Sequence, residues 1–241
     1  MHTFFLPAEA WHEPYQVTGT EARHLVSVLR IKRGDTVRLI DGLGREGIFT
    51  VCETGKRHAS LTPETIVIHK RPPGITLAIG YGRGLRRGWL LEKAVELEAA
   101  GVWFWQADRS QGNVPEESKE TWLSQMLAGA KQTGNPWLPG LATLPGGVDE
   151  LIMKRDGFDK RFVLWEGAAQ GAILSLEDLT PAANVLFALG PEGGFSEREI
   201  TRLTQADFTP VSLGNRILRW ETAAMLCLGL AWWARQQETM P

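Results

Sequence analysis

Two glycine-rich loops, each lying between an apolar run and a helix signal, constrain this 241-residue chain more than any other feature. The first loop follows residues 185–189, an apolar run typical of a strand buried on both faces in a parallel sheet. The second follows residues 210–213. Loops at the carboxyl ends of parallel strands form the ligand crevice of an open α/β sheet. We therefore expect these two strands to be neighbours and their loops to share one ligand.

Both loops suit a ligand that is held by backbone groups. Gly190, Gly193 and Gly194 permit positive φ and a close approach of the backbone. Ser196, three residues before Glu199, predicts a capped helix start directly after the first loop. Either loop alone could be an ordinary turn punctuated by glycine. Neither matches the dinucleotide fingerprint or the phosphate-cradling P-loop, so the pair predicts a ligand held by backbone and apolar walls.

The residues of these loops carry a family resemblance. Leu189-Gly-Pro-Glu-Gly-Gly-Phe-Ser196 and Leu213-Gly-Asn-Arg-Ile-Leu-Arg-Trp-Glu-Thr-Ala223 closely resemble the two signature loops of the RsmE family. Those enzymes are SPOUT-class methyltransferases that methylate N3 of a uridine in 16S ribosomal RNA with S-adenosylmethionine. The resemblance implies an α/β fold with a small β domain. A PUA-like RNA-binding β-barrel would occupy residues 1–72, and a SPOUT domain with a C-terminal trefoil knot would occupy residues 73–241.

The cofactor is expected to lie between the two loops. There, small residues would let the backbone approach the cofactor, and aliphatic side chains would pack against its adenine. The predicted cofactor-binding residues are Leu189, Gly190, Glu192, Gly194, Leu213, Gly214, Ile217 and Leu218. Glu192 either lies near the sulfonium of the cofactor or interacts favourably, as a carboxylate, with the positive end of the dipole of the following helix. Residues 166–167, after a predicted strand at 161–165, are another candidate ligand loop.

Methylation of uracil N3 requires loss of the imide proton and stabilisation of negative charge on the ring. Arg219 is the best candidate for this stabilisation, because its planar guanidinium can donate hydrogen bonds to two acceptor atoms at once. Glu221 is either a general base or a capping acid at the start of a helix. Arg216 is a second candidate for contact with RNA, with a surface salt bridge as the alternative.

The N-terminal part has the short strands and turns of a small β-barrel. A helix is expected at residues 20–30, with strands at 36–40, 47–52, 59–61 and 65–68. His24, Arg30, Lys32 and Arg33 match a family run. The three cations either bind RNA phosphates or interact favourably with the negative end of a helix dipole. Phosphate contacts would position the substrate without reading its sequence.

The polar, proline-rich residues 70–74 mark the expected domain boundary. Beyond it we expect strands at 75–79 and 102–106, helices at 89–100 and 122–131, and a loop at 138–147. The glycine- and arginine-rich residues 80–88 are either a surface turn or an RNA contact. Arg109 matches a family element and is a further RNA-binding candidate. Glu98 and Asn135 depart from the family, which usually has glycine and arginine there.

Composition limits the partners. The formal net charge of −2 gives no global attraction to nucleic acid, so RNA affinity must come from a local patch. The absence of a long apolar run predicts no membrane span, and no residue spacing suggests a metal site. Cys52 and Cys227 are interpreted as reduced packing residues of a cytoplasmic protein. The apolar helix at 222–233 must pack on the sheet or on a partner subunit, and the resemblance implies a homodimer acting on the small ribosomal subunit.

Two other functions remain open on the sequence. The chain could be a non-catalytic RNA-binding or ribosome-assembly protein that keeps the fold without turnover. It could also be a SPOUT methyltransferase for another RNA base, since the departures at Glu98 and Asn135 lie outside the cofactor loops.

Overall fold

The computed structural model describes residues 1–55, 57–82, 86–168, 172–179 and 183–239. The chain forms two compact units, one of Met1–Arg71 with Leu127–Leu138 and one of Pro72–Met126 with Pro139–Pro241. Residues 83–85, part of the predicted basic loop, lie outside the described residues. None of the helices in the described ranges has the length and apolar character needed to cross a bilayer.

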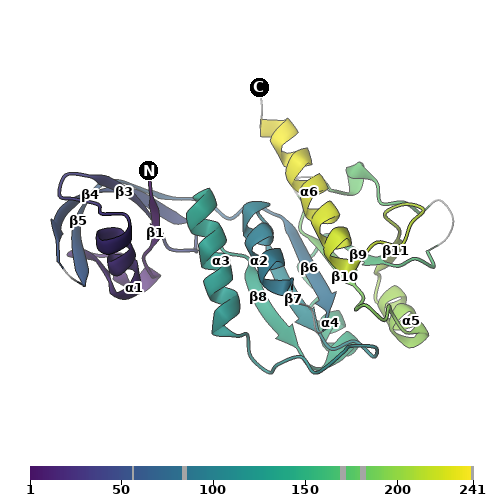
Figure 1. Ribbon diagram of the computed structural model, residues 1–241. Helices are drawn as coiled ribbons and strands as arrows, with labels where there is room; N and C mark the ends of the chain where they lie inside the picture. The colour runs from purple at the N-terminus through teal and green to yellow at the C-terminus, as the bar shows by residue number, and fades with distance from the viewer. Residues whose placement is uncertain (56, 83–85, 169–171, 180–182, 240–241) are drawn as a thin grey trace. The chain divides into compact units, whose positions relative to one another are not determined.

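The first unit is a curled five-stranded sheet packed around a short helix (Figure 1). The strand order is β1-β3-β4-β5-β2, with β1 parallel to β3 and the other pairs antiparallel. Its core is built from inward-facing side chains such as Phe4, Leu39 and Phe49, onto which Leu25 packs. The strands are β1 (Thr3–Phe5), β2 (Tyr15–Thr18), β3 (Thr36–Ile40), β4 (Arg45–Thr54) and β5 (His58–Ile68).

Two local expectations for this unit need adjustment. The predicted helix at 20–30 is an α-helix only over α1 (Gly19–Arg23), continues as a π-helical segment η2 (His24–Val28), and ends before Arg30, whose φ is 55°. The two short strands expected at 59–61 and 65–68 are one strand, β5, whose pairing with β4 shifts register twice. Register shifts break the regular alternation along a strand, which explains why the sequence suggested two segments.

The second unit is a six-stranded, all-parallel sheet flanked by helices (Figure 1). The strand order is β11-β9-β10-β6-β7-β8. The strands are β6 (Ile75–Gly80), β7 (Gly101–Trp105), β8 (Gly140–Leu144), β9 (Lys160–Leu164), β10 (Val185–Leu189) and β11 (Thr209–Val211). Its helices are α2 (Arg87–Glu96), α4 (Gly147–Met153), α5 (Glu197–Gln205) and α6 (Trp220–Thr239). Helix α3 (Glu120–Thr133) begins in this unit, and its residues from Leu127 onward belong to the first unit.

Strand β10 lies in the interior of the six-stranded sheet, between β9 and β6, and all five of its residues are buried. Leu186 and Ala188 face the cluster that contains residues of α4 and α5, such as Leu151 and Leu203. Successive strand residues point to opposite faces, so the other three side chains of β10 face the opposite side of the sheet. Burial on both faces is the reason for its uninterrupted apolar sequence.

Two expectations for the second unit are wrong. Residues 138–147 are not a loop, because they contain β8 and the start of α4. Strands β10 and β11 are not neighbours, because β9 pairs with both and lies between them. Their loops still share one edge of the sheet, and the end of β9 contributes a third segment there.

Candidate active site

A crevice opens where β9, β10 and β11 end. Its larger cavity, of about 660 Å³, is lined by the loop after β10, by the end of β9 and by the start of α6. An adjoining cavity of about 410 Å³ is lined mainly by the loop after β11. The two cavities share Leu164, Glu166, Ile217, Leu218 and Ala223. Ligand pockets commonly have volumes of about 300–1,000 Å³, so this crevice is large enough for a small-molecule ligand.

The loop after β10 makes a tight turn into α5. Gly194 has a φ of 70°, a conformation that favours glycine. The predicted capping box is present: Ser196 Oγ accepts from the backbone N–H of Glu199, and the Glu199 carboxylate accepts from the N–H of Ser196. The helix start fixes one end of the loop, and β10 fixes the other.

The loop after β11 forms the other wall. Gly214 has a φ of 130°, and no atom lies within 4 Å of the position that a Cβ would take there. Ile217 is 84% exposed, which is unusual for an isoleucine and leaves an apolar surface at the junction of the two cavities. This loop therefore offers an open backbone and an uncovered aliphatic side chain on the same side of the crevice.

The structure brings the eight predicted cofactor-binding residues together. The larger cavity is lined by Leu189, Gly190, Glu192 and Gly194, the smaller by Leu213 and Gly214, and both by Ile217 and Leu218. The candidate catalytic residues Arg219 and Glu221 line the larger cavity, and Arg216 lines the smaller. Glu166 lines both, and its Oε1 atom would lie 3.5 Å from a Cβ at Gly194.

The crevice is rich in carboxylates. Glu166, Glu192 and Glu221 line the larger cavity, and among the described residues of its lining Arg219 is the one cationic side chain. The described residues contain no group of three or more His, Cys, Asp or Glu side chains arranged to hold a metal ion. This charge balance favours a ligand that carries positive charge.

Trp220 is a site residue that sequence reasoning missed. Its indole Nε1–H donates to Glu192 Oε1 at 3.2 Å, which joins the start of α6 to the loop after β10. Its position between Arg219 and Glu221 was visible in the sequence, but its partner is 28 residues away. No local pattern reveals such a contact.

The predicted RNA-binding residues lie in different places. His24, Arg30, Lys32 and Arg33 are exposed in the first unit. Arg30, Lys32 and Arg33 form no ion pair with any residue that the structure describes. Arg109, in the second unit, donates from Nη1 to the backbone carbonyl of Gly193 at 3.1 Å.

A hollow in the first unit adds two arginines that the sequence did not single out. It has a volume of about 530 Å³ and is lined by Gly19, Thr20, Arg23, Ser27 and Arg57. Within the described part of the chain, neither arginine is ion-paired. Unpaired guanidinium groups beside hydroxyls are suited to phosphate oxygens.

Comparison with known families gives this arrangement its class. A family model described as an RNA methyltransferase domain matches residues 69–232, and a model of an RNA methyltransferase PUA domain matches residues 17–64. The parallel sheet with its crevice and the curled sheet beside it in sequence are therefore those of an RNA methyltransferase.

Relatives and solved structures define the family. Ribosomal RNA small subunit methyltransferase E of Bacillus subtilis is 28% identical over 225 residues, which cover 89% of this chain and 88% of the relative. The protein of the same name from Synechocystis is 27% identical, with 88% and 70% of the two chains covered. The crystal structure of a ribosomal RNA small subunit methyltransferase E from Neisseria gonorrhoeae, bound to S-adenosyl methionine, has a TM-score of 0.79 at 25% identity and covers 95% of each chain. The chain belongs to the ribosomal RNA small subunit methyltransferase E family.

Proposed function

We propose that this protein transfers a methyl group from S-adenosylmethionine to N3 of a specific uridine in 16S ribosomal RNA. The assembled small ribosomal subunit is its substrate. The observation that carries the proposal is the convergence of both glycine loops, Arg219 and Glu221 on one crevice. The names of the relatives and the S-adenosyl methionine in the Neisseria structure support the same substrates.

The residues of the crevice fit the methyl donor. Gly214 leaves its backbone open to a ligand, and Ile217 and Leu218 offer aliphatic surface for a purine ring. Glu166, Glu192 and Glu221 suit a cationic group, and the sulfonium of the donor is one. When bound, the donor supplies an electrophilic methyl group on that sulfonium.

Two side chains of the crevice are assigned to the uracil. As the N3–C bond forms and the S–C bond breaks, the N3 proton must leave the ring. Glu221, half-buried at the start of α6, accepts this proton, and Arg219 stabilises the negative charge that develops on the uracil oxygens. Arg216, exposed in the same loop, contacts the flanking RNA.

The first unit holds the RNA backbone. Its exposed cations Arg30, Lys32 and Arg33, together with His24, position the substrate through phosphate contacts. Arg23 and Arg57 offer two further guanidinium groups for phosphate at the hollow beside α1. We assign residues 1–72 to the RNA-binding PUA-like domain and residues 73–241 to the SPOUT domain with its C-terminal trefoil knot.

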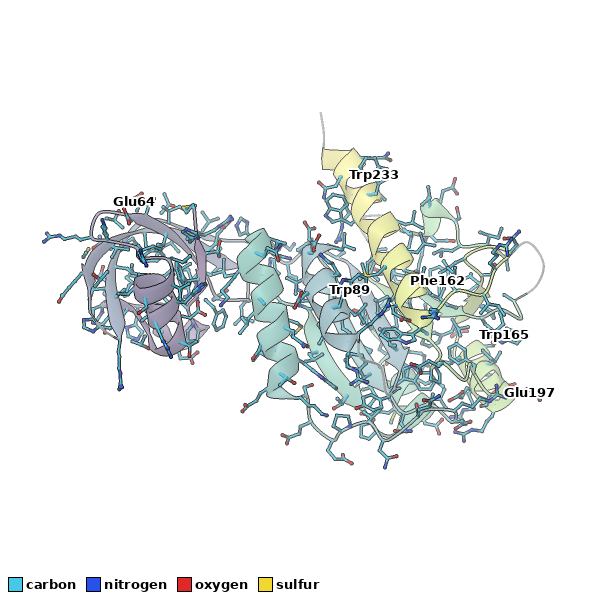
Figure 2. The ribbon with its side chains drawn as sticks, in the orientation of Figure 1. Glu64, Trp89, Phe162, Trp165, Glu197 and Trp233 are labelled. Carbon is cyan, nitrogen blue, oxygen red and sulfur yellow. The ribbon has the colours of Figure 1, made fainter. Side chains whose placement is uncertain are left out.

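The enzyme acts in the cytoplasm as a homodimer. Helix α6 is apolar on most sides, and Trp233 on it is 54% exposed (Figure 2). A large exposed aromatic side chain on such a helix supports its use in subunit contact.

One assay tests the proposal. The protein is incubated with labelled S-adenosylmethionine and small subunits that lack the modification, and the methylated nucleoside is identified by mass spectrometry. We expect 3-methyluridine from 16S ribosomal RNA. Label on another nucleoside would assign the enzyme to another base, and absence of label would leave a non-catalytic RNA-binding or ribosome-assembly protein.

A further inference from the structure

Glu192 and Gly193, adjacent residues of the loop after β10, each accept a hydrogen bond from a side chain of another segment. On one side, the Trp220 indole Nε1–H donates to Glu192 Oε1 at 3.2 Å. On the other, Arg109 Nη1 donates to the carbonyl oxygen of Gly193 at 3.1 Å. Trp220 begins α6, whereas Arg109 follows β7, so two distant parts of the chain meet at the middle of one loop.

On the Arg109 side, the two backbones approach closely. A Cβ added at Gly193 would lie 3.0 Å from the Cβ of Arg109 and 3.2 Å from its carbonyl oxygen. Such distances are shorter than ordinary carbon contacts of about 3.5–4.0 Å, so a side chain at Gly193 would force the segments apart. Glycine at position 193 is therefore explained by this contact.

The segment that carries Arg109 is itself firmly anchored. Glu199, fully buried, accepts from the backbone N–H of Asp108 at 2.7 Å and from that of Ser196 at 2.7 Å. Ser196 Oγ donates to Asp108 Oδ2 at 2.6 Å. A buried carboxylate with two backbone donors fixes both segments, so Arg109 projects from a rigid base.

On the Trp220 side, a third segment supports the same loop. A Cβ at Gly82 would overlap the Glu192 carboxylate, so this carboxylate packs directly on the backbone that follows β6. The two oxygens of Glu192 thus meet Trp220 on one side and Gly82 on the other.

We propose that Arg109 and Trp220 are positioning residues that clamp the loop after β10 at Glu192 and Gly193, through the Glu192 carboxylate and the Gly193 carbonyl, in the shape that binds the methyl donor. This inference rests on the proposed function, because it assigns the loop after β10 to S-adenosylmethionine. Arg109, which lines neither cavity, then supports the donor site through the Gly193 carbonyl. Contact of Arg109 with RNA is the competing outcome of the test. Neither side chain touches the reacting atoms in this role.

The test is calorimetry of S-adenosylmethionine binding to the full chain and to Arg109→Met and Trp220→Phe. Arg109→Met keeps the apolar stem and removes the guanidinium, and Trp220→Phe keeps an aromatic ring and removes the N–H. Loss of one such hydrogen bond is expected to raise the donor Kd roughly three- to tenfold. Arg109→Lys, which retains a cationic N–H donor, is expected to restore most of the affinity.

Two variants are matched controls. Arg202→Met removes another arginine of the second unit, one that pairs with Asp149 and lies outside the cavity lining. Trp89→Phe makes the same aromatic change at an exposed position of α2 that lines neither cavity. Both should keep the wild-type Kd for the donor. The thermal unfolding midpoint of each clamp variant without donor should match that of its control, since a merely structural role would lower it.

Binding to small subunits separates the outcomes. For Arg109→Met we expect the wild-type affinity and salt dependence. The salt dependence is the slope of the logarithm of the binding constant for small subunits against the logarithm of the salt concentration. If Arg109→Met keeps the donor Kd and lowers the magnitude of this slope by about one, Arg109 contacts an RNA phosphate and the proposed clamp is wrong. If the wild type binds the donor and both variants bind it equally well, the clamp alone fails. If the wild type does not bind the donor, the proposed function fails.

Discussion

The guanidinium of Arg235 on α6 donates from Nη2 to the backbone carbonyl of Glu98 at 3.3 Å, just beyond the end of α2. Nη2 also donates to the carbonyl of Leu97 at 3.3 Å, and Nη1 donates to that of Pro73 at 3.4 Å. Carbonyls at the carboxyl end of a helix have no partner within the helix. One side chain of α6 therefore satisfies the end of α2 and ties it to the residues before β6.

Replacement of Arg235 by methionine should destabilise the protein. The change keeps an apolar stem but leaves these carbonyls without their charged donor, so the free energy of unfolding should fall by about 2 kcal/mol. Urea unfolding followed by circular dichroism measures the difference. Arg202→Met is the control, because its pair with Asp149 is half-exposed and should contribute less than about 1 kcal/mol. Equal losses for the two variants would contradict the capping role.

Glu98→Gly should stabilise the protein. Glu98 has a φ of 56°, a left-handed conformation that costs a residue with a Cβ about 1–2 kcal/mol. Its carboxylate lies 3.8 Å from Arg235 and is 44% exposed, so the lost ion pair is worth little. After allowance for the greater chain entropy of glycine, we expect a gain of about 0.5–1 kcal/mol. Glu96→Gly, in the last turn of α2, should instead lose about 1 kcal/mol.

Cys227 should make stability depend on alkaline pH. Burial in α6 raises the pKa of its thiol from 9.0 to about 12. Between these values the unfolded chain releases the proton and the folded chain keeps it. Stability therefore falls as pH rises, by up to about 1.4 kcal/mol per pH unit.

Unfolding free energies at pH 8 and pH 10 test this effect against Cys227→Ala. The wild type should lose about 1.4 kcal/mol more than the variant over this interval, because the other titrating groups are common to both. Identical pH profiles would show that the thiol is not protected by burial. The interpretation of Cys227 as a packing residue is confirmed by its burial, but that of Cys52 is wrong, because Cys52 is exposed. In the native state Cys52 should therefore react with Ellman's reagent, whereas Cys227 should react only after unfolding.

The carboxylates of the crevice should discriminate between donor and product. S-adenosylmethionine carries one more positive charge than S-adenosylhomocysteine, so loss of a carboxylate weakens binding of the donor more. Glu166→Gln should lower the preference for the donor roughly threefold, given the screening at an exposed position. Glu197→Gln, outside the cavity lining, should leave the ratio of the two Kd values unchanged. An unaltered ratio in Glu166→Gln would place that carboxylate away from the sulfonium.

Arg219→Ala should separate chemistry from donor binding. Removal of a group that stabilises the uracil anion should lower kcat by about 10²–10³-fold. The donor Kd should stay within a few-fold of the wild-type value. Single-turnover methyl transfer and calorimetry measure the two quantities. Loss of donor affinity together with activity would reassign Arg219 to the donor-binding residues.

The sequence predicted the elements whose residues carry a local signal. Residues 185–189 match β10 because burial on both faces makes the strand uniformly apolar. The capping box at Ser196 also rests on neighbours within one helical turn. Strand β8 was missed because four of its five residues are half-buried or exposed and show no alternation.

Strand order and the contacts of the clamp could not be predicted locally. The insertion of β9 between β10 and β11 depends on packing across the whole sheet. Arg109 and Gly193 are 84 residues apart, and nothing in either segment indicates the other. The sequence also offered residues 166–167 as a candidate ligand loop, but only the strand order shows that Leu164 and Glu166 lie between the two glycine loops.

The position of Trp220, Glu221 and Ala223 at the start of the last helix has a consequence for biosynthesis. Translation proceeds from the N-terminus, so these residues are synthesised after every other wall of the crevice. Capture of the methyl donor must therefore wait until the start of α6 has been made and has docked on the sheet.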